Sequence, residues 1–218
     1  MAGNGIYFNE SKPKGSLDRE IVFLCEGKDD AYFLDTVAEN LGISADRLGI
    51  TFVEGSTNFC ENVIALSKTS AFVTGDVKTI VVFHDCDGSN STSAELINCL
   101  IRNGFPKLSH SEIVRTEWRG FERQFGYFEI GIAGEGALED LILSSCQHES
   151  RYIRATTALA DQELETGELD HRSKRVSQIY LSLYPTHWRG VGRALKAGVF
   201  DNSHNAFDQV REFIRQLF

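Results

Sequence analysis

The stretch IVVFHDCDGSNST, residues 80–92, begins with four apolar residues. A histidine, two aspartates separated by one residue and a run of glycine and polar residues follow them. The apolar run from Ile80 to Phe83 is typical of a buried parallel strand. Side chains of a strand alternate between its two faces, so Asp85 and Asp87 are expected on the same face. Ligand sites of open α/β sheets lie at the carboxyl ends of the strands, and two adjacent carboxylates favour a bound cation. The stretch therefore predicts both a sheet and a site at its edge.

Two strand and helix units precede this stretch. Residues 21–25 and 49–53 read as strands, and the segments 29–42 and 57–70 after them have helical patterns. A third helix is expected over 91–104. Strands that alternate with helices indicate a parallel sheet whose crossover helices cover both of its faces.

The pattern changes after residue 110. Residues 110–118 and 125–133 predict an antiparallel strand pair at the edge of the sheet, and residues 136–146 predict a helix. Only helices are expected beyond about residue 150, over 151–164, 173–185, 190–198 and 206–218. The predicted fold class is thus α/β. We expect the chain to consist of a flexible tail over 1–18, a catalytic domain over 19–147 and a helical C-terminal region over 148–218 that packs on this domain.

Composition limits the classes of function. The chain has 218 residues, 42% of them hydrophobic, and a formal net charge of −9, as expected for a globular protein with a substantial core. No apolar run is long enough to cross a bilayer, and the first residues lack the pattern of a signal peptide, so we expect no membrane association and a cytoplasmic location. The five cysteines form no Cys-x-x-Cys pair, and we interpret them as reduced, mostly buried thiols.

The net charge disfavours a protein that coats nucleic acid through a basic surface. One segment, however, is locally basic. Between His171 and Gly198 there are six basic residues and no acidic ones. The sequence leaves two interpretations open for this segment, a solvated helix face and a phosphate-binding surface.

Three acidic clusters fall at expected strand or helix ends. The first is EGKDD, residues 26–30, in which Gly27 permits a sharp turn and Asp30 points back toward Glu26. Asp85 and Asp87 form the second cluster. Glu139 and Asp140, in LEDLIL, form the third. Parallel strands bring their carboxyl ends to one edge, so the three clusters are expected to meet there.

These motifs carry a family resemblance. Glu-Gly-x-x-Asp after one strand, with Asp-x-Asp after another about sixty residues later, resembles the Toprim domain of topoisomerases, bacterial primases, the ribonuclease that matures 5S rRNA and the overcoming-lysogenization-defect nucleases. EGKDD is similar to the first motif of the 5S rRNA maturase, whereas LEDLIL followed by a lysine is more similar to the last group. The span from Ile21 onward also resembles a little-described bacterial Toprim-like family in which LED and a pattern like K…YLSLYP…AGVFD recur.

The resemblance implies a parallel-sheet, Rossmann-like Toprim fold and a nuclease that cleaves DNA or RNA with Mg²⁺ or Mn²⁺. It implies that one ion is held by four carboxylates, those of Glu26, Asp30, Asp85 and Asp87, and that Glu26 acts as general base or acid. Glu139, with Asp140 beside it, would complete a second metal site, and Lys174 would stabilise charge on the phosphate. The sequence has no Walker-type phosphate loop, so a partner ATPase, as in phage defence, would have to act in trans. Assembly as a homo-oligomer is left open.

Two alternatives compete with this interpretation. DCDGS, residues 85–89, is similar to the Asp-x-Asp-Gly-Thr motif of haloacid-dehalogenase-like phosphatases, in which the first aspartate is the nucleophile. That scheme gives EGKDD no role. The other alternative is a Toprim-like binding module with the same fold and no catalytic activity. Nicking of a plasmid, hydrolysis of a small phosphate monoester, or neither, would separate the three.

Overall fold

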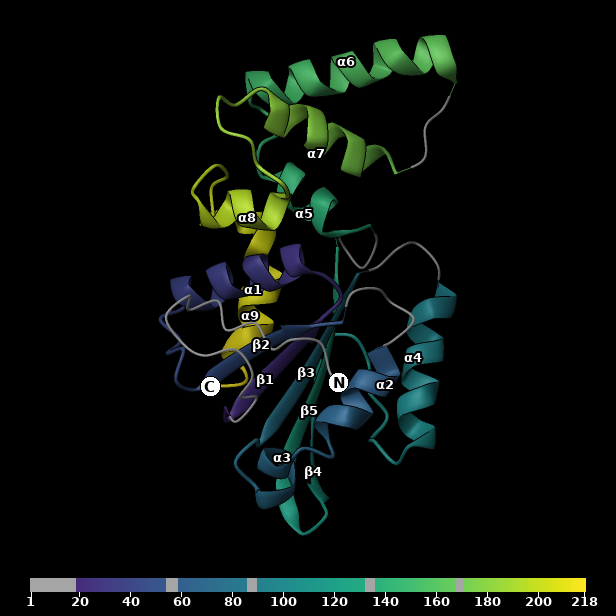
Figure 1. Cartoon of the computed structure of the whole chain (residues 1–218), viewed down its shortest axis with the longest axis vertical. Coiled ribbons are helices and arrows are strands. Elements are labelled where there is room, and N and C mark those ends of the chain that lie inside the picture. Colours follow the sequence, from purple (N-terminus) through teal and green to yellow (C-terminus); the bar gives the residue numbers. More distant parts are fainter. Residues whose placement is uncertain (1–18, 54–58, 86–89, 132–135, 168–170) are drawn as a thin grey trace.

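Five strands form a single mixed sheet at the centre of this computed structural model, which describes residues 19–53, 59–85, 90–131, 136–167 and 171–218 (Figure 1). The strands are β1 (Ile21–Cys25), β2 (Leu48–Phe52), β3 (Thr79–Asp85), β4 (Glu112–Trp118) and β5 (Phe121–Ile130), in the order β2-β1-β3-β5-β4. β2, β1, β3 and β5 are parallel, and β4 runs antiparallel to β5 at the edge. The expected α/β class and the antiparallel edge pair are confirmed.

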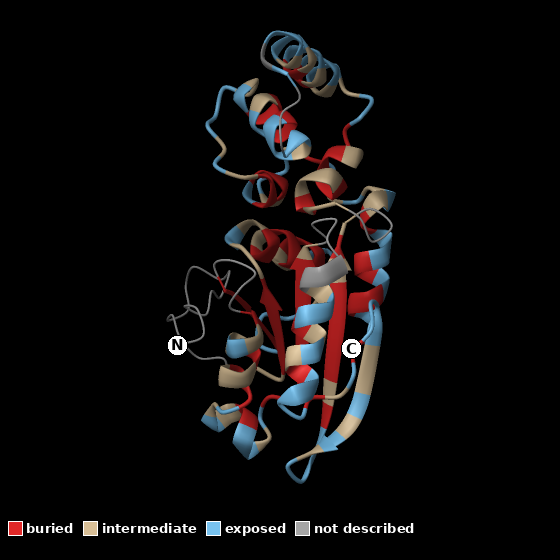
Figure 2. Cartoon of the chain, turned by 90° about the vertical axis from the view of Figure 1, so that its right-hand side faces the viewer, coloured by how far each residue is buried: buried red, intermediate tan, exposed pale blue. Residues whose placement is uncertain are grey.

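Alternation along β1 explains why the sheet has helices on both faces. Ile21, Phe23 and Cys25 lie in one apolar cluster, whereas Val22 and Leu24 lie in the other. Successive side chains of a strand point to opposite faces, so a strand that is apolar throughout needs a covering layer on each side. The described residues of all three inner strands, β1, β3 and β5, are largely buried, as the red ribbons of Figure 2 show.

The helices divide between these faces. One face is covered by α1 (Lys28–Asn40) and α9 (Asp208–Arg215), and α8 (Val191–Lys196) packs on α1; the other face is covered by α2 (Phe59–Leu66), α3 (Ser70–Thr74) and α4 (Asn90–Arg102). The sequence analysis did not predict α3 or the short 3₁₀ helix over Asn205–Phe207. No helix in the described part of the chain is long and apolar enough to cross a membrane.

The last helix returns to the central sheet. Phe213 of α9 packs against Phe128 of β5, with ring centroids 5.0 Å apart, and against Phe83 of β3 at 5.9 Å. Gly126 of β5 leaves the room for this contact, because a Cβ there would come within 3.2 Å of both Phe213 and Val81. The apolar core of this face therefore runs without a break from β1 to the C-terminal helix.

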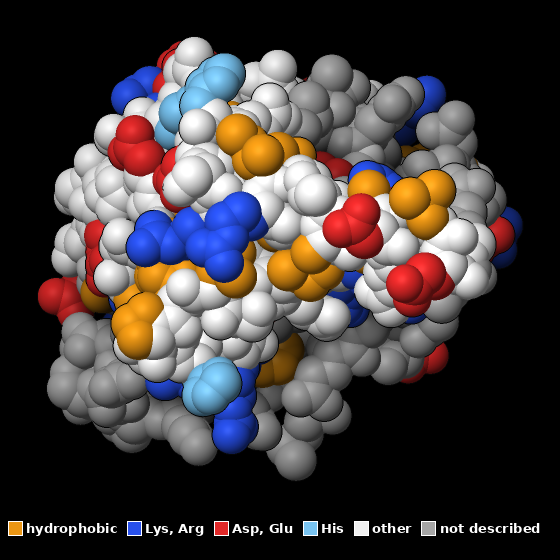
Figure 3. All heavy atoms as spheres, turned by 90° about the horizontal axis from the view of Figure 1, so that it is seen from above, with side chains coloured by type: hydrophobic (Ala, Val, Ile, Leu, Met, Phe, Trp, Pro, Cys, Tyr) orange, Lys and Arg blue, Asp and Glu red, His pale blue; other side chains and the backbone are white. Residues whose placement is uncertain are grey.

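Three helices extend beyond the carboxyl ends of the strands. They are α5 (Leu138–Ser144), α6 (Ser150–Thr166) and α7 (Arg172–Ser182), and α6 and α7 lie side by side at the end of the molecule (Figure 1). Ile153 and Leu164 of α6 are 55% and 87% exposed. Figure 3 looks down on this end and shows small apolar patches separated by charged side chains.

One expectation about the cysteines is wrong. Cys60 of α2 and Cys99 of α4, 39 residues apart in the sequence, form a disulfide, whereas Cys25 and Cys146 are free and buried as expected. α2 and α4 pack beside each other on the same face of the sheet, which brings the two side chains together. Sequence spacing carries no signal of this contact, because it depends on where the two crossover helices settle.

Candidate functional site

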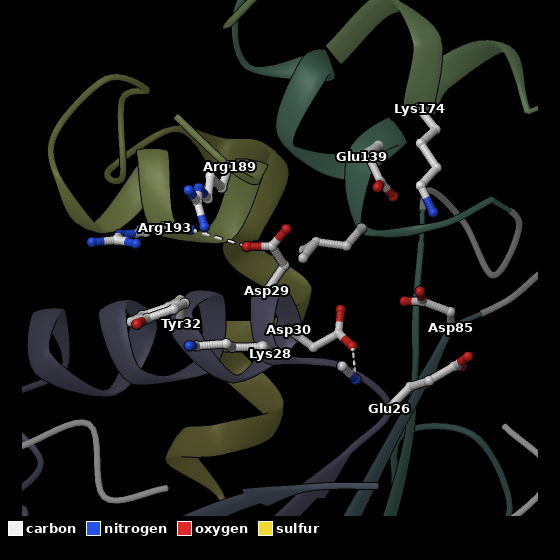
Figure 4. A pocket seen from close by; sticks show the side chains of 12 residues that line it. Glu26, Lys28, Asp29, Asp30, Tyr32, Asp85, Glu139, Lys174, Arg189 and Arg193 are labelled. Atoms are coloured by element: carbon white, nitrogen blue, oxygen red, sulfur yellow. Dashed lines mark hydrogen bonds between the residues drawn. The ribbon is translucent and has the colours of Figure 1, made fainter. Parts of the chain in front are cut away.

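A cleft of about 550 Å³ lies at the carboxyl ends of β1 and β3, between the sheet and the helices α5, α7 and α8. Its described lining brings together residues from both ends of the sequence, and Figure 4 shows them: Glu26, Gly27, Lys28, Asp29, Asp30, Tyr32, Asp85, Leu138, Glu139, Lys174, Arg189 and Arg193. The predicted edge of the sheet is therefore where the structure has its acidic cleft. Among the described lining residues, none is a histidine or a cysteine.

The EGKDD segment forms one wall of the cleft. Gly27 has an extended backbone and precedes the first turn of α1, and its N–H donates a hydrogen bond of 2.7 Å to Oδ2 of Asp30. This contact is the capping interaction of a helix start, and it holds the Asp30 side chain back toward Glu26, as the spacing predicted. Glu26 follows the last residue of β1 and lies half-buried at the same edge.

Asp30 is in an environment that opposes its charge. The side chain is buried, and burial raises its pKa to about 8. The Gly27 N–H acts in the opposite direction, and the nearby carboxylates of Glu26, Glu139 and Asp29 raise the pKa further. Burial and the neighbouring carboxylates therefore both disfavour the charged form of Asp30.

Asp85 is the last residue of β3, which lies between β1 and β5. It is half-buried in the cleft wall and faces the same hollow as Glu26 and Asp30 (Figure 4). Asp87, its expected neighbour on the same strand face, falls outside the described residues. Within the described ranges, no three His, Cys, Asp or Glu side chains are placed so that they could hold a metal ion as they stand.

The third acidic cluster divides between two tasks. Glu139 lines the cleft, where burial raises its pKa and Lys174 opposes that rise. Asp140 is not among the lining residues. One of its oxygens accepts a hydrogen bond of 3.0 Å from the N–H of Ala137 at the start of α5, and the other accepts from the hydroxyl of Ser173 on α7. Asp140 therefore ties α7 to the start of α5, next to Glu139.

The basic segment after His171 also divides. Lys174, Arg189 and Arg193 line the cleft, and the Lys174 side chain points from α7 toward Asp85 (Figure 4). Arg172 instead pairs with Glu163, and Lys196 pairs with Asp35 and Glu39. The segment thus divides between residues that line the cleft and residues that pair with acids of the protein itself.

Asp29 is a cleft residue that the sequence analysis did not assign to the site. Burial raises its pKa, although backbone N–H groups of Arg193, Val191 and Gly192 act against that rise. The N–H of Arg193 lies 3.4 Å from Oδ1 of Asp29. Asp29 therefore joins the start of α8 to the start of α1 and so positions Arg189 and Arg193 over the cleft. Its place in the acidic motif was a signal, but its partner lies 164 residues further on in the sequence.

The fold and the cleft define a mainly parallel α/β protein. It has a cleft with acidic residues at the carboxyl edge of its sheet, and lysine and arginine side chains line the opposite side of this cleft. Residues 20–218 match a family model, and the chain belongs to that family, described as "Protein of unknown function (DUF3226)". No curated protein matches the sequence at a significant level.

Solved structures with a similar fold come from OLD proteins. The C-terminal region of the Xanthomonas campestris pv. campestris OLD protein is 20% identical, and the match covers 93% of this chain and 97% of that one with a TM-score of 0.50. The C-terminal region of the Burkholderia pseudomallei OLD protein is 17% identical over 91% of this chain and 98% of that one, with a TM-score of 0.48. At these identities the likeness concerns the fold.

Proposed function

We propose that the protein is a nuclease of the Toprim type, which hydrolyses phosphodiester bonds of DNA or RNA in the acidic cleft with Mg²⁺ or Mn²⁺. The observation that carries the proposal is the lining of one hollow by four side chains. Glu26 and Asp85 come from the ends of two strands, Asp30 from the first turn of α1, and Lys174 from a distant helix. The fold shared with the C-terminal region of an OLD protein supports the proposal. OLD stands for overcoming lysogenization defect, and the sequence motifs resemble those of the nucleases of this group.

The donor set fits a hard divalent cation. The acids of the cleft offer carboxylate oxygens, which Mg²⁺ and Mn²⁺ prefer, and not the sulfur and imidazole ligands of typical zinc sites. Burial raises the pKa of Asp30 and of Glu139, and nearby carboxylates add to both rises, so a bound cation would favour the charged form of each. Glu26, Asp30 and Asp85 would hold the ion together with Asp87, and Glu139 would serve a second ion. We leave Asp140 out of this set, because its two carboxylate oxygens already accept hydrogen bonds, one from Ala137 at the start of α5 and the other from Ser173 on α7.

A bound cation would neutralise charge on the phosphate and lower the pKa of an attacking water. The chain supplies the remaining tasks. Glu26 would accept the proton of that water, and Lys174, whose amine points into the cleft, would stabilise charge on a nonbridging oxygen. Arg189 and Arg193 would hold the flanking phosphates at the rim. A protein of net charge −9 can bind a polyanion in this way, because local potential governs the approach.

The cleft gives the phosphatase alternative less support. In that scheme Asp85 is a nucleophile that forms a covalent intermediate, and Glu26 and Asp30 have no task. Both of these acids lie in the same cleft as Asp85, and Asp30 is buried there. A role in phage defence and a partner ATPase in trans rest on the resemblance of the motifs alone.

The test uses supercoiled plasmid, single-stranded DNA and RNA with Mg²⁺ or Mn²⁺, with products resolved on gels. We expect metal-dependent cleavage that falls by about 10²-fold or more in Glu26→Gln and Asp85→Asn. Asp161→Asn is the matched control, because Asp161 is an exposed acid of α6 outside the cleft lining, and it should cleave like the wild type. Cleavage that persists in EDTA or in Asp85→Asn would contradict the proposal. Cleavage of none of the substrates, with binding retained, would favour the non-catalytic module.

Two further measurements separate the roles. Hydrolysis of p-nitrophenyl phosphate that survives Glu26→Gln would favour the phosphatase. Lys174→Ala should lower cleavage and leave the melting temperature nearly unchanged, because Lys174 is exposed and contributes little to folding. Lys68→Ala, which removes an exposed lysine at the end of α2, is the control for charge alone.

A further inference from the structure

A second hollow of about 290 Å³ opens from the acidic cleft. The two share four lining residues, Asp29, Glu139, Lys174 and Arg189, so they are continuous with each other. The remainder of the second hollow is lined by α7 and by the segment His187–Val191 that leads into α8. We call it the side groove. None of its remaining lining residues has a role in the chemistry proposed above.

The side groove follows α7 away from the acids. Its lining residues on α7 are Lys174, Ser177, Gln178, Leu181 and Ser182, whose spacing of three and four places them on one face of the helix. Eight residues at 1.5 Å per residue separate the two ends of this face by about 12 Å. If a phosphate of a nucleic-acid strand lies at Lys174, the neighbouring nucleotide of that strand would therefore lie in the side groove.

The chemistry of the side groove differs from that of the cleft. Apart from the shared Asp29 and Glu139, its described lining includes no acid. Trp188 is half-buried and packs against the apolar core, and Leu181 and Val191 lie in the same lining. A large aromatic side chain with aliphatic neighbours, in the same hollow as the lysine that would contact the phosphate, matches the flat apolar faces of a nucleobase.

Polar groups in the groove match the edge of a base. The amide of Gln178, which lines the groove and is exposed, offers both a donor and an acceptor. Among the described residues, neither the Gln178 amide nor the Trp188 indole makes a hydrogen bond within the protein. The hydroxyls of Ser177 and Ser182, by contrast, donate to carbonyls of their own helix, those of Lys174 at 2.8 Å and Ile179 at 2.6 Å. Gln178 is thus the side chain placed to contact the edge of a bound base.

We infer that the side groove binds one unpaired nucleobase next to the scissile phosphate, stacked on Trp188 and contacted along its edge by Gln178. The inference rests on the proposed nuclease function and adds the form of its substrate. Pockets for small ligands span about 300–1,000 Å³, so a hollow of about 290 Å³ suits a single base and not a base pair. The protein should accordingly prefer single strands, frayed ends or unpaired positions over intact duplex.

The experiment compares two fluorescein-labelled strands of equal length, oligothymidylate and an abasic sugar-phosphate strand, by anisotropy in Ca²⁺, with strand integrity checked on a gel. Base stacking on an aromatic side chain contributes about 1–3 kcal/mol, which is roughly a 5- to 150-fold change in affinity. We expect Trp188→Leu to weaken oligothymidylate binding by about 10-fold or more and to leave binding of the abasic strand unchanged. Gln178→Ala should act in the same direction with a smaller change. Intact duplex should bind more weakly than the single strand.

The control variants remove the same side-chain types elsewhere. Phe121→Leu removes an exposed aromatic side chain at the opposite end of the sheet, and Gln209→Ala removes an exposed amide of α9. Neither should alter the affinity for either strand. If Trp188→Leu does not fold, Gln178→Ala and the quenching of wild-type tryptophan fluorescence by oligothymidylate test the same contact. The other tryptophan, Trp118, packs against Phe105 and Phe125 and should report little.

The outcomes separate this inference from the proposed function. Equal binding of oligothymidylate and abasic strand by a wild type that still cleaves would overturn the base site alone. Equal affinity of wild type and Trp188→Leu for oligothymidylate, or duplex bound as tightly as single strand, would do the same. A wild type that neither binds nor cleaves any of these strands would overturn the proposed function and the base site together.

Discussion

Gly192 of α8 and Asp29 of α1 pack so closely that a side chain at Gly192 has no room. A Cβ at this position would lie 1.9 Å from the backbone oxygen of Asp29. The obstacle is backbone, which cannot swing aside as the end of a long side chain can. This contact fixes α8, and with it Arg189 and Arg193, over the start of α1 and the acidic cleft.

Gly192→Ala should therefore destabilise the fold. Overpacking a close contact costs about 1–3 kcal/mol and more where nothing can yield, so we expect about 3 kcal/mol or more in urea unfolding. Gly49→Ala is the control, because a Cβ there would meet the Arg19 side chain at an ordinary 3.4 Å. It should change the free energy of unfolding by less than about 1 kcal/mol. Equal stability of the two variants would show that α8 does not pack as described.

Metal binding should be visible as stability. A ligand that binds only the folded state stabilises it by about 2.7 kcal/mol at one hundred times its dissociation constant. Millimolar Mg²⁺ or Mn²⁺ should thus raise the melting temperature of the wild type, since it relieves repulsion among the buried acids. Asp85→Asn should reduce or abolish this shift, and Asp161→Asn should keep it. Identical shifts in Asp85→Asn and the wild type would mean that the ion binds elsewhere.

Without metal, stability should fall as the pH rises. The pKa of Asp30 is raised from 3.8 to about 8 in the folded protein, so between these values the folded state holds a proton that the unfolded state has lost. The stabilisation is complete below pH 4, declines up to about pH 8 and is lost above it. One proton corresponds to a slope of up to about 1.4 kcal/mol per pH unit. Urea unfolding in EDTA from pH 5 to 8 measures it, and Asp30→Asn should flatten the profile. A wild-type profile as flat as that of Asp30→Asn would place the Asp30 pKa near its ordinary value.

The disulfide between Cys60 and Cys99 should contribute to stability. In the chain-entropy model, a loop closed over 39 residues is stabilised by about 4 kcal/mol. Dithiothreitol should lower the midpoint of urea unfolding in the wild type and have no effect on a Cys60→Ser, Cys99→Ser double variant. Cys25 and Cys146 are buried thiols and should not react with a maleimide reagent in the folded protein. An unchanged midpoint after reduction would show that the packing of α2 on α4 suffices without the bond.

Local patterns predicted most of the elements. The apolar runs of β1 and β3, the helix after Gly27 and the strand pair after residue 110 were predicted near their observed positions, because periodicity and turn residues act over a few positions of the chain. The five-residue helix α3 was not predicted. It is too short for a helical period to show, and its start depends on the Thr69 side chain, which accepts a hydrogen bond from the N–H of Phe72.

The sequence by itself determined the sheet, its layers and one edge rich in carboxylates, since Glu26, Asp30 and Asp85 each follow an apolar run within five residues. Only the tertiary structure decided what faces that edge. Glu139 and Lys174 line the cleft, Asp140 does not, and Asp29 joins the site through a helix 164 residues away. The side groove beside Trp188 likewise exists only where α7 meets the segment before α8. The physical reason is that strands and turns follow from interactions between near neighbours, whereas the packing of α5, α7 and α8 is the sum of many weak contacts between distant segments, which no single motif encodes.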